Sequence, residues 1–190
     1  MLINDFLKET MEKGEYVDIF RDNFSMNTIF GNIISLGDKL LAINEFNNNG
    51  LSEGFCFIYI SDITRISYGG YEQQAIKISI EENGNSITDK RKMNLENKNF
   101  IDIIIEYFPD HVISIATEGL DDGVLYMGKY IASDKEFLKI NSYGTYQGPD
   151  YSELLIKIEN ITKISVNSIY SKNLETVFKN KATVLQNKII

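Results

Sequence analysis

Two stretches, "DITRIS" at residues 62–67 and "NITKIS" at residues 160–165, repeat one pattern 98 residues apart. In each, an Asp or Asn is followed by Ile-Thr, a basic residue and Ile-Ser. Asp and Asn side chains bond to nearby backbone groups and turn the chain, and the isoleucines are typical of a following strand whose apolar side chains point inward. A pattern that recurs at a fixed distance indicates an internal duplication.

The match continues toward the N-terminus. "KLLAINEF" (39–46) aligns with "EFLKINSY" (136–143), and "FGNIIS" (30–35) aligns with "MGKYIA" (127–132). Further back, a helical stripe recurs: Leu2, Ile3, Phe6 and Leu7 align with Phe100, Ile101, Ile104 and Ile105. We therefore predict four segments: a first copy at 1–85, a linker at 86–94, a second copy at 95–178 and a basic tail at 179–190.

Each copy is predicted to be one helix followed by five short antiparallel strands. The second helix is ambiguous, because "FIDIIIEYF" (100–108) also fits a strand, and only the alignment favours a helix within 95–108. Gly31 and Gly128 fall in mid-strand, where they suit a sharp bend. The predicted strands are 15–20, 26–36, 39–46, 54–60 and 63–68, then 111–117, 123–132, 136–143, 153–159 and 161–167.

Five strongly bent strands usually close into a small barrel. We therefore predict a mainly β, α+β fold of two tandem five-stranded antiparallel barrels, each preceded by a helix. This pattern resembles the Sm-like family, through "FGNI" at 30–33 and an Asp before each third strand, at Asp38 and Asp134. The resemblance implies barrels that associate through strands four and five. It also implies RNA binding through a loop Asn and an Arg-Gly pair after strand four.

The residues that would carry RNA binding are missing. The loops before the third strands read "GDKLLA" (37–42) and "SDKEFLK" (133–139), with no Asn at the expected place. The Arg-Gly pair is replaced by "ISD" (60–62) and "IEN" (158–160), and no aromatic residue stands beside a cation there. Because a base-stacking surface needs aromatic side chains and positive charge, RNA binding is kept only as an alternative.

The charge points to a basic partner. The chain has 27 acidic and 19 basic residues and a net charge of −8, and the strand regions of the two predicted barrels, 14–62 and 110–160, each carry about −5. Such a chain repels phosphate backbones and attracts cationic surfaces. We predict a non-catalytic protein-binding module, for example a bacterial immunity protein that neutralises a cationic toxin. The candidate partner-binding residues are Glu118, Asp121, Asp122, Asp22, Asp38 and Asp134.

Catalytic and metal chemistry is sparse. His111 is the only histidine and is predicted to start a strand, and Cys56 is the only cysteine and is predicted to fill a core. Without a second His or Cys, neither a zinc site nor a cofactor is expected. "EGLDDG" (118–123) could hold a cation but lacks the spacing of a calcium loop. A small-ligand binder or enzyme that uses a cleft between the barrels is the remaining alternative.

The last predictions concern location and assembly. No signal peptide is visible, no apolar run approaches about 20 residues, and abundant Ile, Asn and Lys suggest a bacterial source. We predict a cytoplasmic protein away from membranes. The two barrels are predicted to pair internally as a pseudo-twofold dimer, with "CFIYI" (56–60) and "LLIKI" (154–158) at the joint, which would leave a monomer. Arg65 and Lys163 are predicted to face water.

Overall fold

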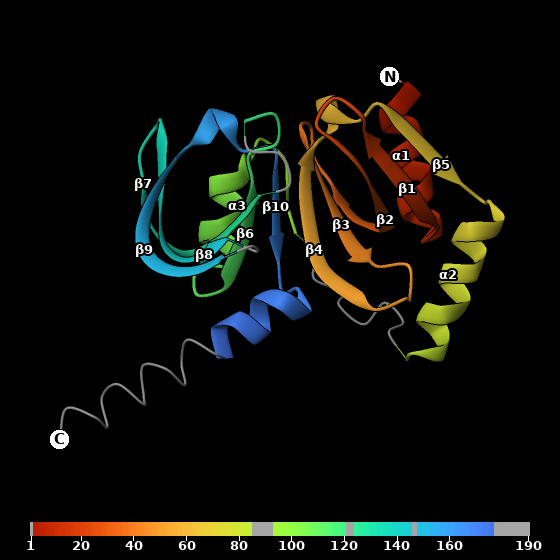
Figure 1. Ribbon diagram of the computed structural model, residues 1–190. Helices are drawn as coiled ribbons and strands as arrows, with labels where there is room; N and C mark the ends of the chain where they lie inside the picture. Colours follow the sequence, from red (N-terminus) through yellow and green to blue (C-terminus); the bar gives the residue numbers. More distant parts are fainter. Residues whose placement is uncertain (1, 85–92, 121–123, 146–147, 177–190) are drawn as a thin grey trace.

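A computed structural model of the chain describes residues 2–84, 93–120, 124–145 and 148–176. Its ten strands form one antiparallel sheet in the order β5-β1-β2-β3-β4-β10-β6-β7-β8-β9 (Figure 1). The mainly β, α+β fold is confirmed. The strands do not form two closed five-stranded barrels, however, because the two halves are joined into one open sheet.

The two halves repeat one order of elements. The first contains α1 (Leu2–Lys13), β1 (Tyr16–Arg21), β2 (Ser25–Leu36), β3 (Leu40–Phe46), β4 (Ser52–Tyr59), the 3₁₀ turn η1 (Ile60–Asp62), β5 (Arg65–Tyr68) and α2 (Tyr71–Glu82). The second contains α3 (Phe100–Tyr107), β6 (Val112–Ala116), β7 (Leu125–Ser133), β8 (Phe137–Thr145), β9 (Gly148–Lys157), η2 (Ile158–Asn160), β10 (Lys163–Val166) and a helix over 169–176. The ambiguous segment is a helix, α3, which begins with a capping box between Asn99 and Asp102.

Sequence reasoning missed the helix that ends each half. The segment "YGGY" (68–71) follows the predicted strand 63–68, and α2 begins at its last residue, Tyr71. Ile76 and Ile80 of α2 pack against Phe30 and Phe46, and Leu174 packs in the same way against Met127 and Tyr143 in the second half. The isoleucines of α2, at 76, 78 and 80, alternate with polar residues, which is the period of a strand and not of a helix.

Two predicted connecting segments can be compared with the structure. Most of the predicted linker 86–94 lies outside the described residues, and Met93 near its end is buried in the core. The segment "GTYQGPD" (144–150), between the predicted strands 136–143 and 153–159, belongs largely to β8, which extends to Thr145, and to β9, which begins at Gly148. Both segments contain Gly, Asn or Pro, which are turn signals in isolation. Residues 179–190 lie outside the described part of the chain.

The halves are joined by β4 and β10. In this antiparallel pair Cys56 lies opposite Ser165 and Phe57 lies opposite Ile164. Since β4 also pairs with β3, and β10 with β6, neither strand has an edge left to close a barrel within its own half. We refer to the β4–β10 pairing as the joint.

The joint is head-to-tail and not pseudo-twofold. It pairs the fourth strand of one half with the last strand of the other, whereas a twofold axis would pair like with like. "CFIYI" (56–60) therefore lies at the joint as predicted. The placement of "LLIKI" (154–158) there was wrong: it belongs to β9, at the far edge of the sheet. A head-to-tail contact uses the fourth strand of only one copy.

The core crosses the joint. Phe55 and Phe57 of β4 pack against Phe108, and Tyr59 packs against Phe100 with ring centroids 4.4 Å apart. These rings belong to a buried cluster that includes residues of β3, β4, α3 and the second half. Figure 1 shows α3 inside the curve of the second half's strands. The halves therefore share a core and are not two separately packed units.

Burial corrects the alignment of the first helices by one residue. Leu7 is fully buried in α1, and in α3 the fully buried residue is Ile104, whereas Ile105 is 48% exposed. Leu7 therefore corresponds to Ile104, at the same spacing of 97 that separates Gly31 from Gly128. The run of three isoleucines at 103–105 had hidden the correct register, because each of them fits an apolar stripe.

Glycines allow strands to come close at the bends and at the joint. A Cβ on Gly31 would lie 2.1 Å from the carbonyl oxygen of Asn44, and one on Gly128 would lie 2.4 Å from that of Asn141. Gly54 lies at the end of the joint, where a Cβ would lie 2.1 Å from the carbonyl oxygen of Val166. The prediction that Gly31 and Gly128 accommodate strand bends agrees with the register shifts in β2 and β7 near these positions.

The far edge of the sheet carries charge where the joint is apolar. By register, Phe55 of β4 corresponds to Glu153 of β9, and Ala42 corresponds to Lys139. Lys139 and Glu153 form an ion pair of 2.7 Å. Burying these charges under a further copy would be costly, and charged edge strands resist pairing with other sheets.

We therefore still predict a monomer, because charged side chains on the edge strand β9 resist pairing with another copy. The reason inferred from the sequence, that both copies pair their edge strands internally, does not hold, since β5 and β9 remain at the edges of the sheet. Light scattering after size-exclusion chromatography should give one species at the chain mass of 21.7 kDa. A mass at a multiple of this value that grows with protein concentration would show that β9 and β5 do recruit further copies.

Candidate functional site

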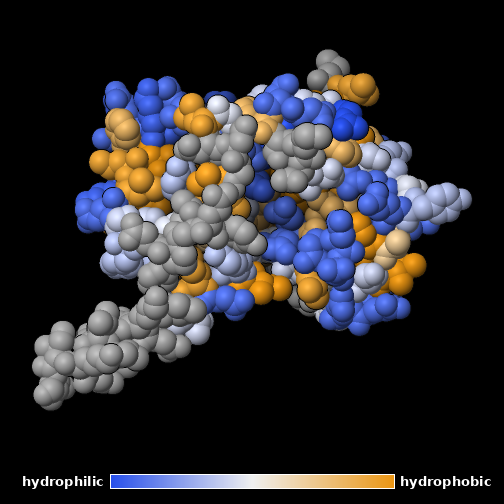
Figure 2. All heavy atoms as spheres, in the orientation of Figure 1, coloured by the Kyte–Doolittle hydropathy of each residue, from blue (hydrophilic) through white to orange (hydrophobic). Residues whose placement is uncertain are grey.

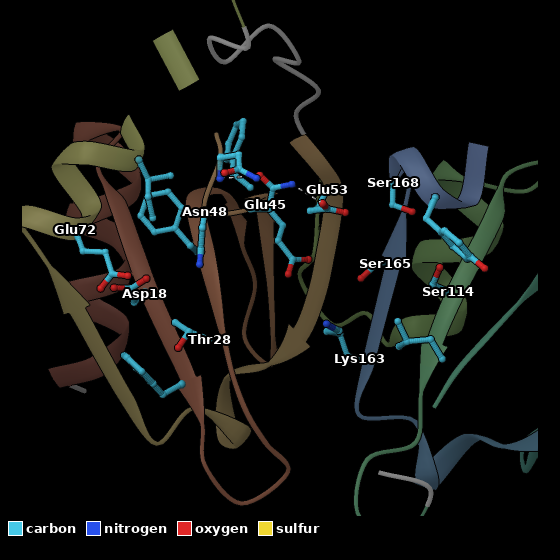
Figure 3. Close-up of a pocket in the computed structure, with 18 of the residues that line it drawn as sticks. Asp18, Thr28, Glu45, Asn48, Glu53, Glu72, Ser114, Lys163, Ser165 and Ser168 are labelled. Carbon is cyan, nitrogen blue, oxygen red and sulfur yellow. Dashed lines mark hydrogen bonds between the residues drawn. The ribbon is translucent and has the colours of Figure 1, made fainter. Parts of the chain in front are cut away.

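A cleft of about 760 Å³ lies between the two halves, beside the joint. Four carboxylates line it, all from the first half, and Lys163 is the only basic residue among the lining side chains. Figure 2 shows hydrophilic side chains gathered over the boundary between the halves. The carboxylates are those of Asp18 in β1, Glu45 in β3, Glu53 in β4 and Glu72 in α2 (Figure 3). We refer to this feature as the acidic cleft.

Strand alternation directs Asp18 into the cleft. Its neighbours Val17 and Ile19 are fully buried in the core under α1, so the side chain between them points to the other face of β1. There α2 supplies Gln73, whose amide donates a hydrogen bond to Asp18, and Glu72, whose carboxylate lies close by (Figure 3). Burial raises the pKa of Asp18, and the Glu72 carboxylate adds to the rise while the Gln73 hydrogen bond opposes it.

Glu45 and Glu53 come from the hairpin of β3 and β4. The amide nitrogen of Asn47 donates to Glu53 at 3.0 Å, whereas Glu45 and Lys163 point toward one another across the joint (Figure 3). Burial opposes the charge of Lys163, but Glu45 favours it, and the pKa of Lys163 is raised on balance. Its ammonium is therefore protonated at neutral pH. The prediction that Lys163 faces water was wrong, because the joint partly buries it; Arg65 is exposed as predicted.

The opposite wall belongs to the second half, mainly to β10 and β6, and bears no carboxylate among the residues that line the cleft. It presents the hydroxyls of Ser114, Ser165 and Ser168, with apolar side chains of Leu125 and Met127 beside them. Ser114 is only 6% exposed, and its hydroxyl makes no hydrogen bond within the described part of the chain. The cleft therefore has one acidic wall and one wall of hydroxyls with an ammonium.

Several of the carboxylates predicted to bind a partner have hydrogen-bond partners within the chain. Asp22 accepts two hydrogen bonds from the Arg65 guanidinium, each 3.1 Å, and the Arg65 and Thr64 hydrogen bonds lower the pKa of Asp22 to about 2. Asp38 accepts from the backbone of Asn97, and Asp134 caps the turn before Phe137. Asp121 and Asp122 lie outside the described residues.

Glu118 has a structural partner as well. Its carboxylate accepts a 2.5 Å hydrogen bond from Arg21, a 2%-exposed residue of the first half, and a 2.8 Å bond from the Thr162 hydroxyl. Arg21 also donates to the backbone carbonyl of Thr162 at 3.0 Å. This ion pair ties the halves together next to the joint, which gives Glu118 a structural role.

Sequence reasoning missed the acidic cleft because its residues come from strands far apart in the chain. A signal was present nonetheless: Asp18 interrupts "YVDIFR" and Glu45 interrupts "LLAINEF", both otherwise strongly apolar strands. A carboxylate at such a position must either pair or face a hollow. What the sequence did not reveal was that β10 would bring Lys163 opposite them.

Cys56 and His111 take the structural positions predicted for them. Cys56 is fully buried, and burial raises the pKa of its thiol to about 12, which makes it a core residue and not a nucleophile. His111 directly precedes β6 and packs edge-on against Phe108. Within the described ranges, no three His, Cys, Asp or Glu side chains lie close enough to hold a metal ion. In that same part of the chain, no helix is long and apolar enough to cross a membrane.

No protein-family model matches the chain, and comparison with curated proteins and with solved structures gave no significant match. The function is therefore argued from the cleft itself.

Neutralising Asp18 and Asp22 should change stability in opposite directions. The raised pKa of Asp18 means that its charge is less favourable in the folded chain, so stability is lost as the pH rises above its ordinary value of 3.8. Asp18→Asn should therefore raise the urea midpoint at pH 7 and lose this advantage near pH 3. Asp22→Asn should lower the midpoint at pH 7, since the lowered pKa of Asp22 marks a favourable charge. Equal effects of the two variants would contradict this assignment.

Removing the charge of Glu118 should weaken the joint. Glu118→Gln leaves the buried guanidinium of Arg21 without a counter-charge, which should lower the free energy of unfolding by about 3 kcal/mol in urea denaturation. Glu9→Gln is the matched control, because the Glu9–Lys13 pair is exposed on α1 and should contribute nothing measurable. Equal stability of Glu118→Gln and wild type would show that the ion pair does not hold the halves together.

Proposed function

We propose that this protein is a non-catalytic binding module that captures a basic protein partner, and that the acidic cleft is where cationic side chains of that partner bind. One observation carries the proposal: four carboxylates face one ammonium in a single cleft, and none of the four forms an ion pair with a Lys or Arg among the described residues. A cation that enters the cleft relieves their mutual repulsion.

The chemistry of the cleft supports binding over catalysis. Lys163 stands beside Ser165 on β10 and near Ser114, which are residue types used in nucleophilic catalysis. A lysine acts as a general base only when its pKa is lowered, and Glu45 acts in the opposite direction here. The cleft carboxylates are also too dispersed to make a metal site.

The charge of the cleft favours a basic protein over RNA, because phosphates would be repelled by the same carboxylates. A partner with a nucleic-acid-binding surface of its own, such as a secreted nuclease toxin, has the required positive charge. The immunity role in a bacterial cytoplasm is proposed on this complementarity.

We also infer that the halves are diverged Sm-like units. The support is the repeated element order, the matching strand order β5-β1-β2-β3-β4 and β10-β6-β7-β8-β9, and the paired bends at Gly31 and Gly128. An experimental structure should superpose residues 16–68 on 112–166 strand for strand. Strands that match in order but bend in different directions would contradict a common origin.

A capture experiment with matched charge variants tests the proposed function. The cleft variant neutralises Asp18, Glu45, Glu53 and Glu72, and the control variant neutralises the exposed Glu12, Glu96, Asp110 and Glu136. Both change the net charge from −8 to −4. In extract of the native host, wild type and control should retain the same basic protein, and the cleft variant should lose it by at least about tenfold.

Two outcomes would contradict the proposal. If the cleft variant retains the partner as well as the control does, the partner binds elsewhere on the surface. If wild type retains no basic protein at low or physiological salt, the module does not work by charge complementarity.

A further inference from the structure

The two walls of the acidic cleft are complementary to different chemical groups of a ligand. The first-half wall presents only carboxylates as charged groups, which bind a cation. The other wall presents Lys163 and Ser114, whose polar atoms can donate hydrogen bonds to an oxygen acceptor. A ligand that fills the cleft well must therefore carry a cation and, a short distance away, an uncharged or anionic oxygen.

The donor wall is unsatisfied in the described part of the chain. Ser114 is 6% exposed, yet its hydroxyl has no hydrogen-bond partner there. Lys163 is partly buried and forms no ion pair there, although the field of Glu45 keeps it charged. Both groups line the cavity, so their polar atoms can donate hydrogen bonds to an occupant of the cleft (Figure 3).

We propose that the occupant of the cleft is a basic segment of polypeptide, in which an Arg or Lys side chain meets the carboxylates and a backbone carbonyl accepts from Lys163 and Ser114. The inference rests on the proposed function and narrows it to one mode of binding. Phe30, Leu125 and Met127 line the same space and can contact the methylene groups of the inserted side chain. The volume, about 760 Å³, lies in the range of about 300–1,000 Å³ that is usual for sites enclosing a small ligand.

A free polyamine shares the cation but fits less well. It has no carbonyl for Lys163 and Ser114, and its charge is opposed by the ammonium. Lys163 should therefore distinguish the two ligands: it should strengthen the binding of the peptide and weaken the binding of the polyamine.

The test is a titration of the isotope-labelled full chain, followed by backbone amide shifts in NMR spectra. The probes are acetyl-Gly-Arg-Gly-amide, the same peptide with citrulline in place of arginine, and spermidine. The arginine peptide should shift the amides of Glu45, Ser114 and Ser165. The citrulline peptide, which matches it in size but lacks the charge, should bind about tenfold more weakly, since charge-assisted hydrogen bonds are lost.

Two variants separate the walls. Lys163→Met should weaken the arginine peptide about tenfold and strengthen spermidine, whereas Lys135→Met, at an exposed position, should change neither beyond the small effect of net charge. Ser114→Ala should weaken the peptide severalfold and leave spermidine unchanged. This small substitution also preserves the test if Lys163→Met fails to fold.

Three results would overturn the inference: tighter binding of both ligands by Lys163→Met, equal binding of the arginine and citrulline peptides, or no shifts in the cleft. The first result would show that the cleft binds cations without distinguishing a peptide from a polyamine. The proposed function fails separately, if the full chain captures no basic protein in the charge-variant experiment. Capture without peptide binding in the cleft would leave the proposed function standing and refute only this mode.

Discussion

The structure depends on the pairing of β4 with β10. This one antiparallel contact turns two similar halves into a continuous sheet. It leaves no edge for either half to close a barrel, and it places Phe55 and Phe57 over the second half's helix α3, so that the halves share a core. Because the contact is head-to-tail, it uses β4 once and leaves its counterpart, β9, at the far edge.

The acidic cleft is a consequence of the same pairing. Asp18 belongs to a strand whose other face is buried under α1, and Glu45 lies near the end of β3. Both line the cleft. The joint brings β10 beside them and supplies Lys163, Ser165 and, through β6, Ser114. The carboxylates that make the cleft negative come from the first half, and the hydrogen-bond donors Lys163, Ser165 and Ser114 come from the second half. Binding and the integrity of the joint are thus coupled, and Arg21 with Glu118 reinforces the joint nearby.

Local patterns predicted the local features well. The repeat of "DITRIS" as "NITKIS" located the repeated element order, and the turns predicted at this point are the 3₁₀ turns η1 and η2, which end at Asp62 and Asn160 and precede β5 and β10. Net charge predicted an acidic protein but not where the acids would gather: Glu118 and Asp22 are held by Arg21 and Arg65, which no spacing in the sequence reveals. Pairing between distant strands is decided by which faces are apolar in three dimensions, as the exchange of Phe55 for Glu153 illustrates.

The most direct test is solution NMR of the full chain, through cross-strand Overhauser contacts of β4. Contacts between residues 55–58 and 163–166, with Cys56 opposite Ser165, are expected from the joint. If β4 instead shows contacts to residues 65–68, the first half closes on itself as a barrel, and the account of the joint, the shared core and the acidic cleft is contradicted.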